Sequence, residues 1–168
     1  MARTSTATRA GTNDSTTETP ATQLPTPDPA LARLNRLIGT WTATGRILGA
    51  PDDNIQGTIR FDWLPGGFFL RQQLELDFAA LPIRSLELIG YDPASGAFRS
   101  HVYSSLVGIV SSYRWDIRDD VMTIAIEGAS FRGRFSPDGE SFAGGWRPDP
   151  GAEGPGNVAY DIAGTRVI

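Results

Sequence analysis

Two side chains of this sequence, His101 and Tyr103, have a type and a spacing that could support acid–base chemistry. They stand two residues apart in a strand-like run at 97–104, so both point to the same face of the strand. Histidine is the side chain whose ordinary pKa lies near neutrality, and a phenol can both donate and accept a hydrogen bond. If this face lines a cavity, the pair could orient a polar ligand group or act as catalytic residues that transfer protons.

The direction in which His101 points depends on the register of the hairpin around residues 92–96. A four-residue loop there places Leu88 opposite His101 and Leu86 opposite Tyr103. Because Leu86 and Leu88 are apolar and expected to be buried, this register turns all four side chains inward. We therefore predict that the imidazole and the phenol face the interior.

Two alternatives stay open for this strand. A slip of one residue in the hairpin would place Ser100 and Val102 inside instead. The imidazole could also be a hydrogen-bonded part of the wall, or face solvent, with no functional role.

The composition excludes several classes of chemistry. The chain has no cysteine and no lysine, all 15 basic residues are arginine, and His101 is the only histidine. Disulfides, thiolate nucleophiles, Schiff-base catalysis and multi-histidine metal sites are therefore impossible within this chain. The acidic run at 52–54 lacks the spacing of a calcium-binding loop. We predict neither a bound metal nor a cofactor.

The charge and the hydropathy pattern bear on partners and location. The net charge is −4 and the sequence pI is about 4.9, whereas nucleic-acid binding calls for a basic surface. No apolar run approaches the roughly 20 residues of a membrane span, and no apolar segment follows the early arginines as in a secretory signal. We predict a cytoplasmic protein with no nucleic-acid partner and no membrane partner.

The chain divides at about residue 30. Residues 1–30 are rich in threonine and proline, which predicts a disordered tail, and residues 31–168 form one domain. Asp28 can cap a short helix whose first position is Pro29, and Gly39 ends it. The apolar residues of this helix fall on one side: Leu31, Leu34, Leu37 and Ile38.

Everything after Gly39 indicates strands separated by short turns. The strand-like runs are 40–48, 55–63, 68–78, 84–91, 97–104, 109–117, 121–127, 130–136, 140–147 and 157–166. Several runs alternate apolar and polar residues, which predicts one buried face. The predicted inward residues include Ile59, Phe61, Trp63, Phe68, Leu70, Leu74, Leu76, Phe78, Tyr113, Trp115 and Ile117. Ten antiparallel strands in sequence order predict an all-β, up-and-down barrel that closes to hide its edges and encloses a cavity.

The sequence around the helix-to-strand junction resembles a known group. A short helix followed by Gly39-Thr40-Trp41 and an antiparallel meander is similar to the lipocalin-like, or calycin-type, barrels. More specifically, the chain resembles a bacterial domain family of uncharacterised function in that group. The matching segments are 37–41, 63–70, 89–96, 132–139 and 144–146. The resemblance implies a barrel with a small-molecule pocket and implies no particular reaction.

The chain also resembles nitrobindin, a ten-stranded haem barrel with a similar first strand. That resemblance implies an iron ligand from a histidine near the C-terminus, but the last strand-like run, 157–166, contains none. A haem barrel that uses His101 as its ligand is therefore a minor alternative.

The four tryptophans divide into two predicted roles. Trp41 is expected to plug the closed end of the barrel against the helix. The predicted ligand-binding set is Trp63, Leu86, Leu88, His101, Tyr103, Trp115 and Trp146. We predict binding of a small apolar or aromatic molecule, with a cofactor-independent cyclase or isomerase as the alternative. The oligomeric state is left open.

Overall fold

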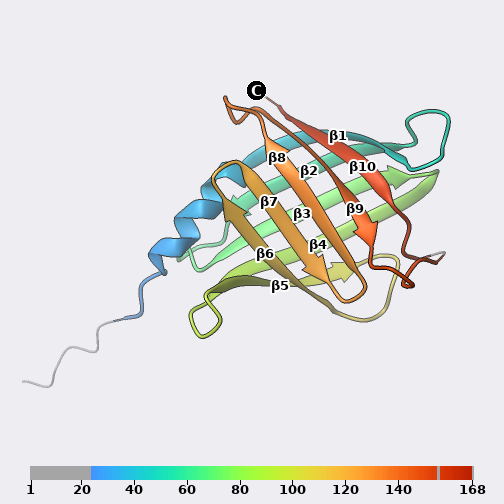
Figure 1. Cartoon of the computed structure of the whole chain (residues 1–168). Coiled ribbons are helices and arrows are strands. Elements are labelled where there is room, and N and C mark those ends of the chain that lie inside the picture. Colours follow the sequence, from blue (N-terminus) through green and yellow to red (C-terminus); the bar gives the residue numbers. More distant parts are fainter. Residues whose placement is uncertain (1–23, 155, 168) are drawn as a thin grey trace, which may run out of the picture.

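The chain folds into a closed barrel of ten antiparallel strands with a short 3₁₀ helix at one end (Figure 1). The computed structural model describes residues 24–154 and 156–167. The elements are η1 (Pro29–Leu37), β1 (Gly39–Ile47), β2 (Ile55–Trp63), β3 (Phe69–Phe78), β4 (Leu81–Asp92), β5 (Ala97–Ser104), β6 (Ser111–Arg118), β7 (Val121–Ile126), β8 (Ala129–Phe135), β9 (Ser141–Pro148) and β10 (Tyr160–Arg166). The predicted fold class and all ten predicted strands are confirmed. Within the described ranges, no helix is long and apolar enough to cross a membrane.

Each strand pairs with its neighbours in sequence, and β1 closes the ring against β10. In this last pairing Trp41 lies opposite Arg166 and Ile47 opposite Tyr160. Closure leaves no strand edge with unpaired backbone groups, which is why ten short strands can form one stable sheet. Residues 1–23, most of the predicted tail, lie outside the described residues, whereas Pro29 and Ala30 already belong to η1.

The helix η1 seals one end of the barrel. The carboxylate of Asp28 accepts a hydrogen bond from the backbone N–H of Ala30 at 2.8 Å, which caps the helix where the sequence predicts. The buried residues of η1 are Leu31, Leu34 and Leu37. They are spaced by three, the period of a 3₁₀ helix, so all three side chains pack into the barrel.

Trp41 lies directly beneath the helix, as predicted. Its side chain is fully buried, and its indole N–H donates a hydrogen bond to the carbonyl oxygen of Leu37 at 2.8 Å. The guanidinium of Arg166 lies 4.3 Å from the centre of the indole ring on the neighbouring strand. The first strand is thereby tied both to the helix and to the closing strand β10.

The inner face follows the predicted alternation in β2, β3 and β6. Near η1 the inward side chains are fully sealed, among them Leu70, Phe98 and Trp115. Toward the opposite end, inward side chains such as Tyr113 and Trp146 remain partly exposed. The barrel is therefore packed at the helix end and more open at the other. Phe68, predicted in the inward row, lies in the turn before β3.

The hairpin between β4 and β5 has the predicted register, but its predicted inner face is the outer one. Leu88 lies opposite His101 and Leu86 opposite Tyr103, as expected. His101 is exposed, however, and 51% of the Tyr103 surface is exposed. The predicted inward orientation of these four side chains is wrong. The buried residues of β4 are instead their immediate neighbours, including Glu87 and Ile89.

The reason for this reversal lies in the preceding hairpin. Ile89 pairs with Leu70, which belongs to the inward row of β3, so Ile89 also points inward. Because side chains alternate along a strand, this pairing fixes which face of β4 points inward. The connecting turn consists of Ala79 and Ala80, both with positive φ, of 50° and 68°. Such turns are usually built from asparagine and glycine, so no sequence signal marks this one or the register that it sets.

Close backbone packing at the inner face of β8 and β9 gives a first testable prediction. Gly133 and Gly144 lie opposite each other, and the ring of Phe131 lies over them. A Cβ atom at Gly144 would overlap backbone atoms of β8, so Gly144→Ala is expected to cost roughly 1–3 kcal/mol of unfolding free energy. Urea denaturation followed by circular dichroism measures this loss. Gly108→Ala is the control, because a Cβ atom there meets open space and the variant should match the wild type.

Candidate binding site in the barrel interior

Glu87 is the one acidic side chain buried in the described part of the chain. Strand β4 carries it on the same face as Ile89, and only 2% of its surface is exposed. The hydroxyl of Ser100 donates a hydrogen bond to its carboxylate, and the indole N–H of Trp115 donates another at 2.7 Å. Both donors reach the same oxygen, Oε1. Three neighbouring strands, β4, β5 and β6, thus build one polar cluster inside an apolar barrel.

The second carboxylate oxygen of Glu87, Oε2, receives no hydrogen bond from a described residue. Every side-chain oxygen or nitrogen that is sealed from water in the described chain has a hydrogen-bond partner. Oε2 must therefore border space that water can enter. Gln72 on β3 is also buried and lies opposite Glu87 of β4. Its side-chain amide makes no hydrogen bond to a described residue, so it too borders space that water can enter. Oε2 of Glu87 and the amide of Gln72 thus border accessible interior space, and neither has a hydrogen-bond partner among the described residues.

Burial raises the pKa of Glu87 to about 7, because a charged carboxylate loses its hydration inside the barrel. The hydrogen bonds from Ser100 and Trp115 act in the opposite direction, since they stabilise the charged form, but they do not offset the burial. Near neutral pH the carboxyl group is therefore divided between its neutral and charged forms. This is the property that a general acid or base requires.

Two tyrosines extend the polar lining toward the open end. Tyr113 on β6 is half-buried, and its pKa is raised by burial and by the nearby charge of Glu87. Burial together with the neighbouring Tyr113 also raises the pKa of Tyr160 on β10. Their hydroxyl groups make no hydrogen bond to a described residue, so by the same reasoning they border accessible space. Both phenols stay neutral at physiological pH and can donate or accept hydrogen bonds to a ligand.

Aromatic rings form the walls around these polar groups. The rings of Tyr113 and Trp146 meet edge to face with centroids 6.0 Å apart, and Phe131 lies 6.0 Å from Trp146. Phe78 and Tyr160 form a second edge-to-face pair at 5.0 Å. Such an arrangement suits a ligand with a flat or apolar body.

The predicted site residues separate into three groups in the structure. Trp115 and Trp146 face the interior beside Glu87 and Tyr113. Trp63 lies at the helix end, where its indole N–H donates to the side-chain oxygen of Asn35 at 2.9 Å. The remaining four lie on the outer face: Leu86, Leu88, His101 and Tyr103. These four side chains therefore do not contribute to the interior cluster.

The outward position of His101 also bears on the haem alternative. A haem inside the barrel would need a ligand that points inward, and the imidazole points away from the interior. The haem interpretation that used His101 is therefore wrong. Among the described residues, no group of three or more histidine, cysteine, aspartate or glutamate side chains gathers as metal ligands do.

Sequence reasoning missed Gln72 and Glu87, and it placed Ser100 and Val102 inside only in the alternative with a slipped hairpin, whereas both are buried with the hairpin in its predicted register. One signal was present for Gln72, which interrupts the inward row that runs through Leu70 and Leu74. A polar residue in an otherwise apolar row is a candidate for the interior, because alternation gives it the same direction as its neighbours. No comparable signal marks Glu87, since β4 carries apolar residues on both of its faces.

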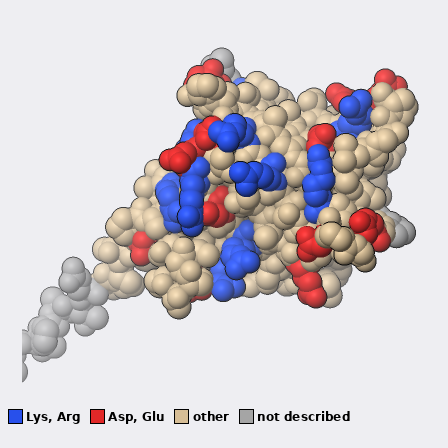
Figure 2. Space-filling view, viewed as in Figure 1, with Lys and Arg blue, Asp and Glu red and all other residues tan. Residues whose placement is uncertain are grey.

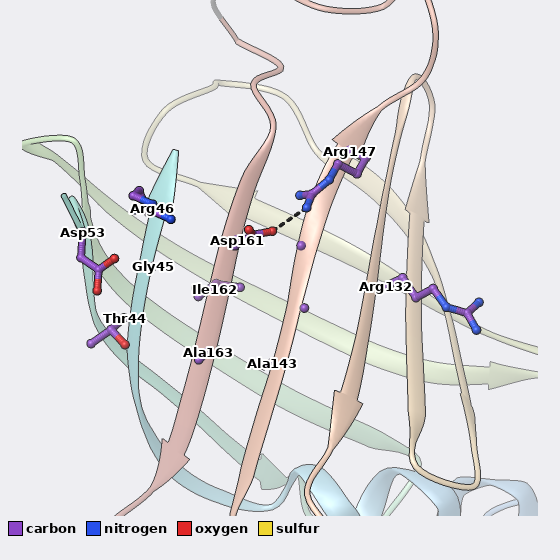
Figure 3. A pocket seen from close by; sticks show the side chains of 12 residues that line it. Thr44, Gly45, Arg46, Asp53, Arg132, Ala143, Arg147, Asp161, Ile162 and Ala163 are labelled. Carbon is purple, nitrogen blue, oxygen red and sulfur yellow. Dashed lines mark hydrogen bonds and ion pairs between the residues drawn. The ribbon is translucent and has the colours of Figure 1, made fainter. Parts of the chain in front are cut away.

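Two surface hollows lie outside the barrel. The larger, of about 610 Å³, spreads over the outer face of β1, β8, β9 and β10 and is floored by small residues such as Ala143 and Ala163 (Figure 3). Arg147 pairs there with Asp161 at 2.6 Å, so part of its charge is already compensated. The second, of about 470 Å³, lies beside the start of η1. Neither reaches the interior cluster, and the larger is wide open to solvent, so we place the candidate site inside the barrel.

The outer surface carries both signs of charge, with basic and acidic side chains interspersed on the face seen in Figure 2. Arg71 on β3 pairs with Asp62 on β2, and Arg134 on β8 pairs with Asp120 in the turn before β7. The Arg71 guanidinium holds the pKa of Asp62 below its usual range through its hydrogen bonds. These pairs are typical of a solvated outer face.

The fold and the interior cluster define this protein as a closed ten-stranded β-barrel whose apolar interior holds a small group of polar side chains. Residues 26–139 match the family described as "Protein of unknown function (DUF1579)", and the chain belongs to this family. A crystal structure of Rv2717c from M. tuberculosis matches this structure with a TM-score of 0.46 and 17% sequence identity, over 84% of this chain and 99% of that one. A search of curated proteins finds no match.

Proposed function

We propose that this protein binds a small, largely apolar molecule inside the barrel, with Glu87 and Gln72 contacting the polar group of the ligand. The observation that carries the proposal is that Oε2 of Glu87 and the side-chain amide of Gln72 lack hydrogen-bond partners among the described residues and border accessible space within an apolar interior. Buried polar groups cost free energy unless they are hydrogen-bonded. Water in the accessible space can satisfy these groups, and a ligand whose polar group takes over their hydrogen bonds gains further free energy by covering the aromatic walls with its apolar body.

The open end of the barrel supports an apolar ligand. The loop at 105–110, between β5 and β6, carries exposed apolar side chains. The most exposed is Ile109, at 73%, and Leu106, Val107 and Val110 are each about half exposed. Leu81, at the start of β4, is also exposed at this end. Exposed apolar side chains at the mouth of a barrel are suited to the entry of an apolar molecule.

A second candidate function is catalysis without a cofactor, as in an isomerase or cyclase. The observation in its favour is the pKa of Glu87, which lies near neutrality. In an isomerisation, the carboxylate would take a proton from one carbon of the substrate and the resulting acid would return it to another, with no net change. Liquid chromatography of the molecule extracted after incubation separates the two functions: a binding protein returns the molecule with its retention time unchanged, whereas an enzyme returns an isomer of the same mass that elutes at a different time.

Filling the interior provides the test of the proposed site. Ser85 lies on the inward face of β4 between Glu87 and the open end, and it is half-buried. Ser85→Trp is expected to occupy the accessible space and to weaken the binding of phenylbutanol at least tenfold in isothermal titration calorimetry. Ser104→Trp, on the neighbouring strand, is the second inward variant in case the first does not fold.

The matched control is Leu86→Trp, which adds a tryptophan one residue away on the outer face. It should bind phenylbutanol like the wild type. If inward and outward variants behave alike, or if the wild type binds neither phenylbutanol nor the corresponding amine or acid, the interior site is contradicted.

A further inference from the structure

We infer that the ligand of the interior site carries a protonated amine, which pairs with the carboxylate of Glu87. This inference rests on the proposed binding function and names the chemical class of the ligand. It starts from an imbalance of charge: the interior holds a buried carboxyl group, and the described chain supplies no cation for it.

No basic side chain of the described chain forms an ion pair with Glu87, and the unpaired arginines Arg46, Arg114 and Arg132 are exposed on the outer face. Arg166 is partly buried, but it lies at the helix end, where it stacks on Trp41 and pairs with Glu140. His101 points outward from the neighbouring strand. A charged Glu87 therefore has only neutral hydrogen-bond donors around it.

The groups that face Glu87 come from β3, β5 and β6, and all of them are neutral. They are the amide of Gln72, the hydroxyl of Ser100, the indole of Trp115 and the phenol of Tyr113. The phenol is kept neutral by burial and by the carboxylate itself. Among these groups, only the carboxyl titrates near neutrality. The accessible oxygen, Oε2, is the atom that a ligand cation would contact.

The walls of the site favour a cation as well. Rings of Tyr113, Trp115 and Trp146 stand around the carboxyl group and toward the open end. The face of an aromatic ring attracts an ammonium group, and the attraction is stronger when water is displaced. A carboxylate together with aromatic faces thus provides both parts of an organic-cation site.

Other ligand classes fit less well. An acid would bring a second negative charge next to Glu87 inside a medium of low polarity, which is strongly unfavourable. A neutral alcohol can only donate a hydrogen bond to the carboxylate, whereas an ammonium group adds the attraction of opposite charges in a medium of low polarity. The expected order of affinity is therefore amine, then alcohol, then acid.

The affinity of the site for an amine must also decrease at low pH. Below the pKa of Glu87, the ammonium group can pair with the carboxylate only after the carboxyl group releases its proton to solvent. The affinity should fall by up to about tenfold for each pH unit below that pKa. Above it, the affinity should stay level until the amine itself loses its proton, near about pH 10.

The test compares three probes of the same shape: phenylbutylamine, phenylbutanol and phenylbutyrate. Isothermal titration calorimetry near pH 8 should show the amine binding at least about tenfold more tightly than the alcohol, with the acid weakest. Glu87→Gln keeps an oxygen that can accept from Ser100 and Trp115. It should remove the preference for the amine and its dependence on pH, so that the amine and the alcohol bind with similar affinity. Glu75→Gln, at an exposed carboxylate on the outer face, is the matched control and should change neither.

Each outcome decides the question. If the alcohol binds as tightly as the amine, or if Glu87→Gln keeps the preference, the amine inference is wrong while the proposed binding function stands. If none of the three probes binds to the wild type, the proposed function itself is contradicted. Proton release, measured by titrating in buffers of different ionisation enthalpy, should approach one proton per amine at a pH below the pKa of Glu87.

Discussion

Replacing Glu87 by glutamine is expected to make the protein more stable near pH 8, by up to about 3 kcal/mol. The pKa of this carboxyl group is about 7 in the folded protein and 4.5 in an ordinary environment. Between these two values the folded state holds a proton that the unfolded state has lost. The free energy of unfolding of the wild type should therefore decrease as the pH rises from 4.5 to 7, by about 1.4 kcal/mol per unit, and stay level above.

The glutamine variant lacks this pH dependence because an amide does not titrate in this range. The two proteins should be equally stable near about pH 4, where the carboxyl group is protonated in both states, and diverge as the pH rises. Urea denaturation at a series of pH values, followed by circular dichroism, measures both curves. Glu75→Gln should follow the wild-type curve, because this carboxylate is exposed. A variant less stable than the wild type near pH 8 would show that the carboxylate form is favoured in the folded state, contrary to the burial argument.

Replacing Trp41 by alanine is expected to lower the free energy of unfolding by about 3–5 kcal/mol. The indole is fully buried between η1 and the barrel, with the rings of Phe142 and Phe135 at 5.3 and 6.4 Å. The substitution removes this packing and leaves the carbonyl of Leu37 without its hydrogen-bond donor. Because the same residue anchors the helix, the backbone amides of η1 should also exchange hydrogen faster in the variant.

The control for this prediction is Leu106→Ala at the opposite end of the barrel. This side chain is half exposed, so its removal should change the free energy of unfolding by less than about 0.5 kcal/mol. Hydrogen exchange followed by mass spectrometry reports on η1 directly. If Trp41→Ala costs less than about 1 kcal/mol and leaves exchange in η1 unchanged, Trp41 does not seal the barrel.

The strands could be predicted because their signals are local. In β2 and β6, apolar and polar residues alternate without interruption, so the inward rows that contain Phe61 and Trp115 follow directly from the pattern. The hairpin register between β4 and β5 was also predictable, because Gly96 ends the loop with a φ of 66°, a conformation that favours glycine. Turn residues and alternation act over a few positions and need no knowledge of the rest of the fold.

The interior site could not be predicted in the same way. Strand β4 presents Leu86 and Leu88 on one side and Ile89 on the other, with Glu87 between them. Hydrophobicity alone favours burying the leucines, and this choice would leave Glu87 outside. The pairing of Ile89 with Leu70 decides the question, and it depends on a turn of two alanines that no sequence rule marks.

The sequence by itself thus determined the order of the elements, the helix cap at Asp28, the role of Trp41 and the closed ten-stranded barrel. Only the tertiary structure decided which face of β4 and β5 points inward. Successive side chains of a strand point to opposite faces. The packing of one side chain therefore fixes the direction of every other side chain in that strand. That choice places Glu87 and Ser100 inside and His101 outside, and with them the chemistry that this barrel can offer to a ligand.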